Sequence, residues 1–182
     1  MIKRILLFAL LRMLPEYRRP LACARLLGVK VGARNRFTGA INFGSEPYLI
    51  ELGDNVTLAQ GTTFITHDGG SGLFRDEHPG LNVFARIIIG NNVFIGSSVT
   101  IMPGVKIGNN VVVGACSVVT KSIPDNVVAA GNPARKIKTI EEYRLGLLER
   151  GIQLPNTPDR SERILRHCRE QDARSDRQIS DR

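Results

Sequence analysis

The sequence contains no tryptophan, and aromatic residues make up only 5% of its 182 residues. Hydrophobic residues still amount to 42%, and 18 residues are glycine. The chain is long and apolar enough for one domain with appendages, but small and aliphatic side chains have to fill its core. This composition argues against a sandwich that is packed around a buried tryptophan.

Cysteine is also scarce, with Cys23, Cys116 and Cys168 widely spaced along the chain. They form no CxxC pair and no Cys/His pattern that is typical of a metal site. We therefore predict free thiols in a reducing, cytoplasmic compartment, and no required metal. Because Cys116 falls within the repeat described below, we expect it to pack rather than to react.

Acidic residues are nearly missing from the first 36 positions, which contain only Glu16. The same stretch holds nine basic residues and so accounts for the net charge of +8: Lys3, Arg4, Arg12, Arg18, Arg19, Arg25, Lys30, Arg34 and Arg36. Such a stretch suits contact with anionic lipid at the inner face of the membrane, or with a phosphorylated substrate. Nucleic acid is a poorer partner, because the sequence has no module that combines aromatic and basic residues.

Long apolar runs are absent as well, since the run at 5–11 is too short to span a bilayer. We predict that residues 1–30 form a helical segment. Within it, residues 2–14 are expected to form an amphipathic or partly buried helix, with an interfacial membrane anchor as the alternative.

An internal repeat of six residues runs through the middle of the chain. Counting in sixes from residue 89 always meets a β-branched aliphatic residue: Ile89, Ile95, Ile101, Ile107, Val113 and Val119. The next residue is usually glycine, and the residue four positions on is usually valine. After two shifts of phase, the column continues upstream at Leu52, Leu58 and Phe64 and at Val31, Phe37 and Phe43. A period of six fits neither an α-helix nor a simple alternating strand.

This period is typical of a short strand followed by a bend, and three such units make a triangular coil that stacks about 4.8 Å from the next. The aliphatic residue points inward, and the small residue beside it, usually glycine, is expected to form the corner because glycine tolerates positive φ. Asparagine at 91–92 and 109–110 also tolerates that conformation and is expected to bond locally. The repeat therefore predicts about four coils, at 31–51, 52–88, 89–106 and 107–124, in a domain that spans 31–135.

The repeat is interrupted by a polar, glycine-rich loop at 66–86, which is the expected functional region. After the repeat ends, a helix at 136–155, with Thr139 and Glu142 as a capping box, is predicted to cap the solenoid. The charged tail at 156–182 is predicted to be flexible, with one helical stretch around 161–170.

Residues 89–138, from IGNNVFIGSSV to GNPARKIK, resemble the shared C-terminal signature of the maltose, galactoside and xenobiotic acetyltransferases. The stretches NFGSEPYLIELGDNV, FITHDGG and LFRDE are similar to polysaccharide-biosynthesis O-acetyltransferases. The resemblance implies an all-β solenoid, a left-handed parallel β-helix of hexapeptide repeats with an extruded loop. The left-handedness of the helix rests on the resemblance alone, because connections between parallel strands are otherwise almost always right-handed.

The resemblance also implies direct transfer from acetyl-CoA to a sugar hydroxyl, with His67 as the general base. A neutral imidazole can take the hydroxyl proton as the new bond forms. Glu46 is expected to hold the other ring nitrogen, with Asp68 as the alternative. A backbone N–H near Ser97 is expected to stabilise the oxyanion.

In the resembling enzymes the coenzyme lies in a groove between the subunits of a homotrimer. The matching positions here are Ser97, Ala115, Thr120 and Lys121, while Arg135, with Lys136 or Lys138, is expected to pair with the coenzyme phosphates. Asp68, Phe74 and Arg75 are expected to contact the acceptor.

Other functions remain open at this point. An antibiotic O-acetyltransferase would share the base and the coenzyme groove, and an amino-sugar N-acetyltransferase usually has an additional nucleotide-binding domain. A β-helical zinc carbonic anhydrase needs three clustered histidines, but His167 lies far from His67 and His78 in the sequence. A non-enzymatic scaffold would not require His67.

Overall fold

The computed structural model describes residues 19–154 and 159–180, so the helix predicted at 2–14 lies outside the described residues. The chain divides into two compact units, Met1–Glu141 and Glu142–Arg182. The described part of the first unit begins with α2 (Arg19–Leu27) and continues as a solenoid of short strands. The second unit is helical.

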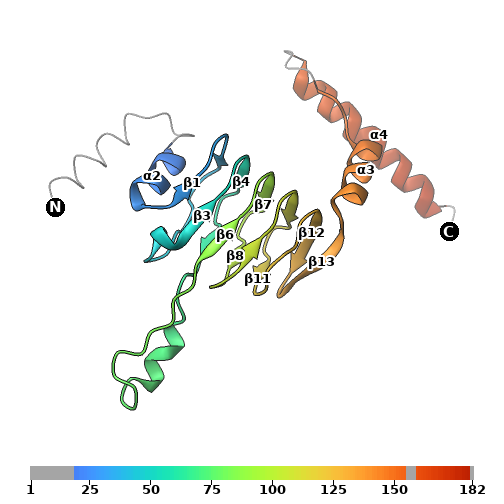
Figure 1. Ribbon diagram of the computed structural model, residues 1–182. Coiled ribbons are helices and arrows are strands. Elements are labelled where there is room, and N and C mark those ends of the chain that lie inside the picture. The colour runs from blue at the N-terminus through green and yellow to red at the C-terminus, as the bar shows by residue number, and fades with distance from the viewer. Residues whose placement is uncertain (1–18, 155–158, 181–182) are drawn as a thin grey trace. The chain divides into compact units, whose positions relative to one another are not determined.

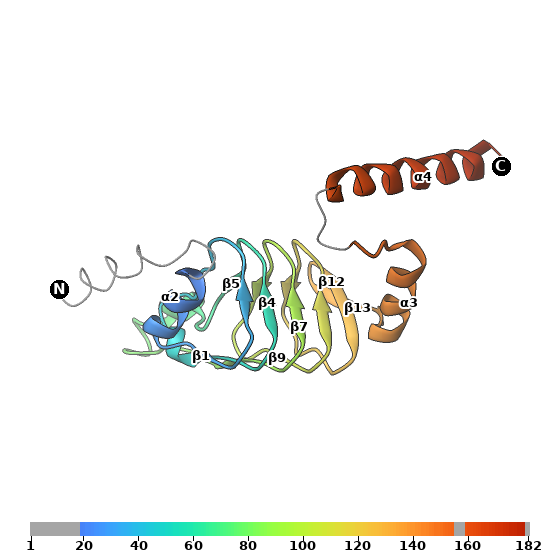
Figure 2. The ribbon, with the colours of Figure 1, turned by 90° about the horizontal axis from the view of Figure 1, so that it is seen from above.

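The strands of the solenoid visit three sheets in turn (Figure 1). The four-stranded sheet holds β1 (Lys30–Val31), β3 (Ile50–Leu52), β6 (Ile87–Ile89) and β9 (Lys106–Ile107). The six-stranded sheet holds β2 (Arg36–Phe37), β4 (Val56–Leu58), β7 (Val93–Ile95), β10 (Val111–Val113), β12 (Val127–Gly131) and β13 (Ala134–Thr139). The three-stranded sheet holds β5 (Thr63–Phe64), β8 (Thr100–Ile101) and β11 (Val118–Val119). Figure 2 shows the strands stacked side by side along the solenoid.

The first column of the repeat stacks as the sequence predicts. Val31 pairs with Leu52, Leu52 with Ile89, and Ile89 with Ile107, always in parallel register. The two phase shifts fall at 44–49, which contains the short 3-10 helix η2 (Pro47–Leu49), and at 65–86. Both segments leave the sheets, so the extra residues do not disturb the stacking.

Aromatic rings fill one end of the solenoid and aliphatic side chains fill the rest. The buried rings of Phe37 and Phe43 lie with centroids 6.1 Å apart, and those of Phe43 and Phe64 lie 5.5 Å apart. In the following coils the same columns are fully buried aliphatic residues: Ile95, Ile101, Val113 and Val119. The buried aromatic rings are thus concentrated in the first coils.

Asparagine builds the corners between the four-stranded and six-stranded sheets. Asn55, Asn92, Asn110 and Asn126 have positive φ between 54° and 60°, whereas the repeat glycines at 90, 96, 108 and 114, which were expected to adopt it, do not. Each of the first three asparagines donates from Nδ2 to the Oδ1 of the next, at 2.9, 3.2 and 2.9 Å. The expectation that these side chains bond locally is wrong, because stacked corners bring each amide against its copy one coil along. The resulting ladder ties neighbouring coils together.

We expect Asn110→Ala to lower the free energy of unfolding by about 2 kcal/mol, because it removes the ladder bonds and forces a Cβ-bearing residue without a polar side chain into positive φ. Asn110→Gly removes the same bonds but tolerates that φ, so it should cost about 1 kcal/mol. Urea unfolding of both variants measures the difference. Equal losses would show that the backbone conformation is not strained at this corner.

The thiol of Cys116 does not pack inside the solenoid, and that expectation is wrong. Cys116 is exposed at a corner with a φ of 59°. The buried neighbour is Ser117, whose hydroxyl donates to the Gly114 carbonyl at 2.7 Å. The repeat places the residue before Ser117 on the outside of the turn.

The C-terminal end of the repeat differs from the prediction. β13 folds back antiparallel to β12, with Ala130 opposite Arg135 and Val128 opposite Lys138. Because this pairing holds residues 134–139 extended, the helix expected at 136–155 is shorter: α3 spans Ile140–Arg150.

The helical stretch expected around 161–170 is longer than predicted, because α4 (Arg160–Ser180) is a continuous helix of 21 residues. Two of its side chains reach the end of α3: Nε2 of His167 lies 3.0 Å from the Arg150 carbonyl oxygen, and Gln171 donates to the same oxygen at 2.8 Å. These contacts join α4 to the end of α3. Within the described ranges, neither α4 nor any other helix is both long and apolar enough to cross a membrane.

Candidate active site

The loop at 66–86 leaves the solenoid through a short two-stranded neck, formed by residues 66–68 and 83–85. His67 forms an isolated antiparallel bridge with Phe84. On either side of this bridge, the Asp68 N–H donates to the Val83 carbonyl at 3.0 Å and the Ala85 N–H donates to the Thr66 carbonyl at 2.9 Å. The tip of the loop, residues 69–82, contains the 3-10 helix η3 (Gly69–Phe74). The neck therefore fixes the backbone at His67.

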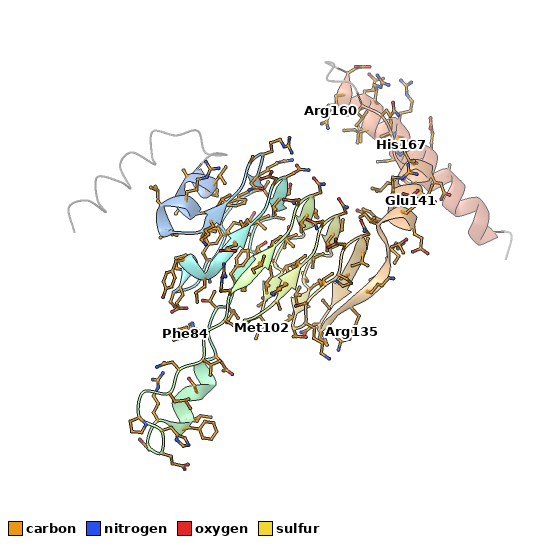
Figure 3. All side chains as sticks on the ribbon, viewed as in Figure 1. Phe84, Met102, Arg135, Glu141, Arg160 and His167 are labelled. Carbon is orange, nitrogen blue, oxygen red and sulfur yellow. The ribbon has the colours of Figure 1, made fainter. Side chains whose placement is uncertain are left out.

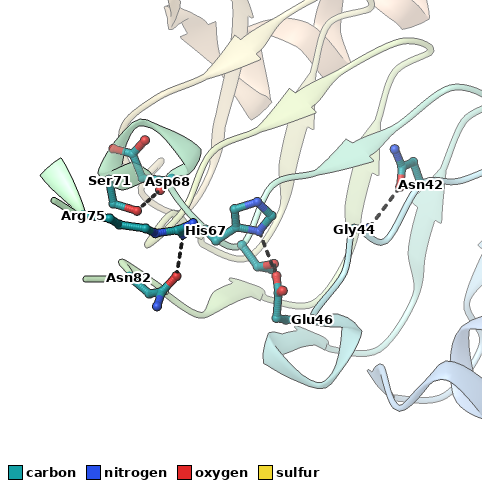
Figure 4. Close-up of polar contacts among 9 residues, drawn as sticks. Asn42, Gly44, Glu46, His67, Asp68, Ser71, Arg75 and Asn82 are labelled. Atoms are coloured by element: carbon teal, nitrogen blue, oxygen red, sulfur yellow. Dashed lines mark hydrogen bonds and ion pairs between the residues drawn. The ribbon is translucent and has the colours of Figure 1, made fainter. Parts of the chain in front are cut away.

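His67 and Glu46 form a close polar pair at the base of the loop (Figure 4). Nδ1 of His67 lies 2.9 Å from Oε2 of Glu46, and the buried Thr66 hydroxyl donates to the same oxygen at 2.7 Å. The side chain of Glu46 is 15% exposed, whereas that of His67 is 41% exposed. The carboxylate is enclosed, and the imidazole can meet a molecule from outside.

The charge of Glu46 decides which nitrogen of His67 carries a proton. The pKa of the Glu46 carboxyl lies below its usual value, first because of the hydrogen bond from Thr66 and next because of the bond from His67. An ionised carboxylate only accepts hydrogen bonds, so Nδ1 of a neutral His67 must carry the hydrogen. Nε2 is then left with its lone pair available, as a general base requires.

A shallow pocket of about 270 Å³ opens beside the imidazole. Its walls come from the segment before η2, from the neck and from the tip: Ser45, Glu46, His67, Asp68, Gly69, Ser71, Arg75, Asn82, Val83 and Phe84. The edge of the Phe84 ring faces the His67 ring, with centroids 6.1 Å apart. The pocket thus offers one apolar wall and several polar groups around a free imidazole nitrogen.

Of the three residues expected to contact an acceptor, Asp68 and Arg75 line the pocket and Phe74 does not. The Asp68 carboxylate accepts a hydrogen bond from the Gly70 N–H at 2.9 Å and caps η3, so it does not hold His67. Arg75 lines the pocket and donates to Asn82 Oδ1 at 3.0 Å. Phe74 is 54% exposed on the tip but is not part of the pocket wall.

The residues expected to bind a coenzyme lie at two different corners of the solenoid. Ser97 and Ala115 stand in register where the six-stranded sheet gives way to the three-stranded one, and Arg135 lies on the hairpin beside them. Thr120 and Lys121 follow β11. The loop of His67 follows β5, which lies in the same sheet two coils earlier, so both segments leave the sheet at the same corner. Figure 3 shows Phe84 and Met102 on the side of the loop and Arg135 farther along the solenoid. All five residues are exposed.

β13 also presents three exposed cations: Arg135, Lys136 and Lys138. Among the residues that the structure describes, no carboxylate lies within ion-pair distance of any of them. An uncompensated positive strip of this kind can bind phosphate groups.

Sequence reasoning missed Thr66 and Phe84. Thr66 is the residue before His67, but only the stacking of coils brings its hydroxyl to Glu46, which lies 20 positions earlier. Phe84 becomes part of the pocket only because the neck pairs it with His67. A threonine directly before a candidate base was the only available signal, and it does not tell where the hydroxyl points.

We expect Thr66→Val to raise the pKa of Glu46 toward its ordinary value of 4.5, because the replacement removes the hydrogen bond that lowers it most. The titration can be followed by the ¹³C signal of the carboxyl group, assigned by its loss in Glu46→Gln. Thr66→Ser keeps the hydroxyl and should titrate like the wild type. An unchanged Glu46 titration in Thr66→Val would contradict this assignment.

Comparisons with known proteins show which family this chain is similar to. A family profile described as "Bacterial transferase hexapeptide (six repeats)" matches residues 86–121. The chain is 54% identical over 127 residues to Protein CapG of Staphylococcus aureus, and the match covers 69% of this chain and 74% of CapG. Four other curated relatives are matched over only about half of their length, between 44% and 55%.

Solved structures give the same picture. A maltose O-acetyltransferase from Clostridium difficile 630 superimposes with a TM-score of 0.57 at 34% identity, covering 73% of this chain and 82% of that chain. A hexapeptide-repeat acetyltransferase from Vibrio cholerae O1 biovar eltor, solved in complex with acetyl-CoA, gives a TM-score of 0.50 at 25% identity, covering 74% of this chain and 83% of that chain.

Proposed function

The chain belongs to the hexapeptide-repeat acetyltransferase family, and from this membership we propose that it transfers an acetyl group from acetyl-CoA to the hydroxyl group of a sugar. The observation that carries the proposal is the pairing of a half-exposed His67 with the enclosed carboxylate of Glu46. A hydroxyl group is a poor nucleophile at neutral pH, so its attack on a thioester needs a base within reach. The free Nε2 of His67 supplies this base at the wall of a pocket.

The proposed role of His67 is to move one proton in each direction. Nε2 accepts the hydroxyl proton as the sugar oxygen bonds to the acetyl carbon. When the carbon–sulfur bond breaks, the imidazolium returns the proton to the coenzyme thiolate. The charge of Glu46 stabilises the imidazolium between these two events. The backbone N–H of Ser97 is proposed to donate to the oxyanion that forms at the acetyl carbonyl.

The proposed donor is acetyl-CoA, which supplies the thioester. The three uncompensated cations of β13 fit its phosphate groups, and the small side chains of Ser97 and Ala115 leave room for a pantetheine arm along the corner. Thr120 and Lys121 are proposed to contact the coenzyme from the other corner. Support for this donor also comes from the Vibrio cholerae relative, which was solved with acetyl-CoA bound.

We further propose that the active enzyme is a homotrimer of left-handed coils. The residues proposed for the base and for the coenzyme are divided between two corners of the solenoid, which flank the three-stranded sheet. In the proposed trimer, the corner with Ser97 and Ala115 of one copy lies beside the loop with His67 of the next copy. The two copies together then form one complete site. Closed rotational symmetry then produces one such site for each copy.

The proposed acceptor is a sugar used in the synthesis of a cell-surface polysaccharide. Support comes from the stretches at 42–56 and 64–70, which resemble O-acetyltransferases of that kind and which contribute Glu46 and His67. The name of the Clostridium difficile relative, a maltose O-acetyltransferase, also points to a sugar hydroxyl.

The test is thiol release from acetyl-CoA in the presence of neutral, acidic and amino sugars. We expect turnover with at least one sugar, and a product whose acetyl group is removed by mild alkali, because an ester is labile under conditions that leave an amide intact. An alkali-stable product would identify an N-acetyltransferase instead. Failure to bind acetyl-CoA at all would overturn the proposal.

A further inference from the structure

Arg75 is held in place at the wall of the pocket beside His67 (Figure 4). Its Nη2 donates to Asn82 Oδ1 at 3.0 Å, and its Nε donates to the Leu81 carbonyl at 3.4 Å. Asn82 is itself anchored, because its Nδ2 donates to the Gly80 carbonyl at 2.8 Å. These contacts use two of the five N–H groups of a guanidinium and fix its plane.

The charge of Arg75 has no ion-pair partner in the part of the chain that the structure describes, since no carboxylate there lies within ion-pair distance of it. The two acids of the pocket have other partners: Glu46 is bound by Thr66 and His67, and Asp68 is bound by the Gly70 N–H. The pocket therefore contains a fixed cation that lacks a counter-ion.

We propose, on the basis of the function proposed above, that the acceptor is an acidic sugar whose oxyanion group is bound by Arg75. A carboxylate or a phosphate accepts two parallel hydrogen bonds from a guanidinium, which a neutral sugar cannot do. The fixed guanidinium would hold the acidic group on the tip side of the pocket. A hydroxyl group elsewhere on the same sugar ring would then face Nε2 of His67.

A structural role for Arg75 would have different consequences. If Arg75 only held the tip of the loop, then Asn82→Ala, which removes one of its anchors, and Arg75→Gln would impair the binding of acidic and neutral sugars alike. If Arg75 binds the oxyanion, then Arg75→Gln abolishes the preference for acidic sugars, whereas Asn82→Ala and Arg75→Lys keep part of it, because the positive charge remains although the fixed guanidinium plane or its parallel hydrogen bonds are lost. The ratio of the affinities for acidic and neutral sugars therefore distinguishes a structural role of Arg75 from a binding role.

The experiment is a calorimetric titration of matched sugars in the absence of acetyl-CoA, so that its result does not depend on transfer. The pairs are galacturonate with galactose and glucuronate with glucose, and the 1-phosphates of both sugars distinguish a carboxylate from a phosphate. In the wild type we expect an acidic member to bind about 10- to 100-fold more tightly than its neutral partner. Arg75→Gln should remove this difference, and Arg36→Gln, which changes an exposed arginine in β2, should not.

The proposal fails if acidic and neutral members of every pair bind equally to the wild type, or if none binds. It also fails if the preference survives in folded Arg75→Gln, with folding checked by circular dichroism. An Arg75-dependent preference for an acidic sugar, with no thiol release from acetyl-CoA, would keep this inference and reject the proposed reaction.

Discussion

Replacement of His67 by alanine is expected to lower kcat/KM for acetyl transfer by about 10²- to 10⁴-fold, the contribution that a positioned general base typically makes. His67 bears the only imidazole in the pocket, and its Nε2 is the nitrogen left free by Glu46. The loss should appear mainly in kcat, because the alanine removes no group proposed to bind the coenzyme. The measurement is thiol release with the best acceptor, together with an independent titration of acetyl-CoA binding.

His78→Ala is the matched control for this variant. His78 lies in the same loop, but it is exposed and is not part of the pocket wall. It should therefore retain the activity of the wild type. If His67→Ala also kept that activity, His67 would not be the base and the proposed mechanism would be rejected.

Replacement of Glu46 by glutamine is expected to lower kcat by about 10²- to 10⁴-fold, although the side chains have the same shape. The amide has no charge to stabilise an imidazolium. It can also turn its NH₂ group toward Nδ1, which would place the proton of His67 on Nε2, the wrong nitrogen. Activity assays give the size of the loss, and ¹⁵N NMR of the imidazole shows whether the tautomer has changed.

Glu51→Gln controls for the removal of a partly buried glutamate. Glu51 is 25% exposed and lies in β3, where it pairs with Lys30 at 2.6 Å and with Arg86. Its loss should weaken these ion pairs and leave kcat unchanged, because neither partner lines the pocket. Equal losses of kcat in Glu46→Gln and Glu51→Gln would mean that both act only through folding.

The stacking of the solenoid was predictable because each coil repeats the same requirement for an inward aliphatic residue. Val31, Leu52, Ile89 and Ile107 align from the period of the sequence alone, and the strand register confirms them. For the asparagines at the corners, the sequence predicted the positive φ correctly, but it predicted the wrong hydrogen-bond partners for their side chains. Their bonds join residues that are 16–37 positions apart, which local sequence patterns do not include.

Residues whose chemical type suggests a role could be predicted from the sequence. Residues whose role depends on their position in space could be predicted less well. The pairing of His67 with Glu46 was expected from the resemblance to known O-acetyltransferases, and the structure brings the two side chains to 2.9 Å. The role of Thr66 depends on the direction of a hydroxyl group, and the role proposed for Arg75 depends on the lack of a described carboxylate within ion-pair distance. In the C-terminal region, the polar composition of 156–182 predicted a flexible tail, and it gave no sign that two side chains of α4 contact the carbonyl of Arg150.

The neck below the loop separates the position of His67 beside Glu46 from the sequence of the loop tip, where we expect acceptor preference to lie. Its backbone pairs at 66–68 and 83–85 hold His67 against Glu46 without any contribution from the tip. We therefore expect that residues 69–82 can be lengthened, shortened or exchanged while the distance between His67 and Glu46 stays constant. A graft of this segment between relatives would carry acceptor preference as a module, and divergence within the family need not pass through inactive intermediates.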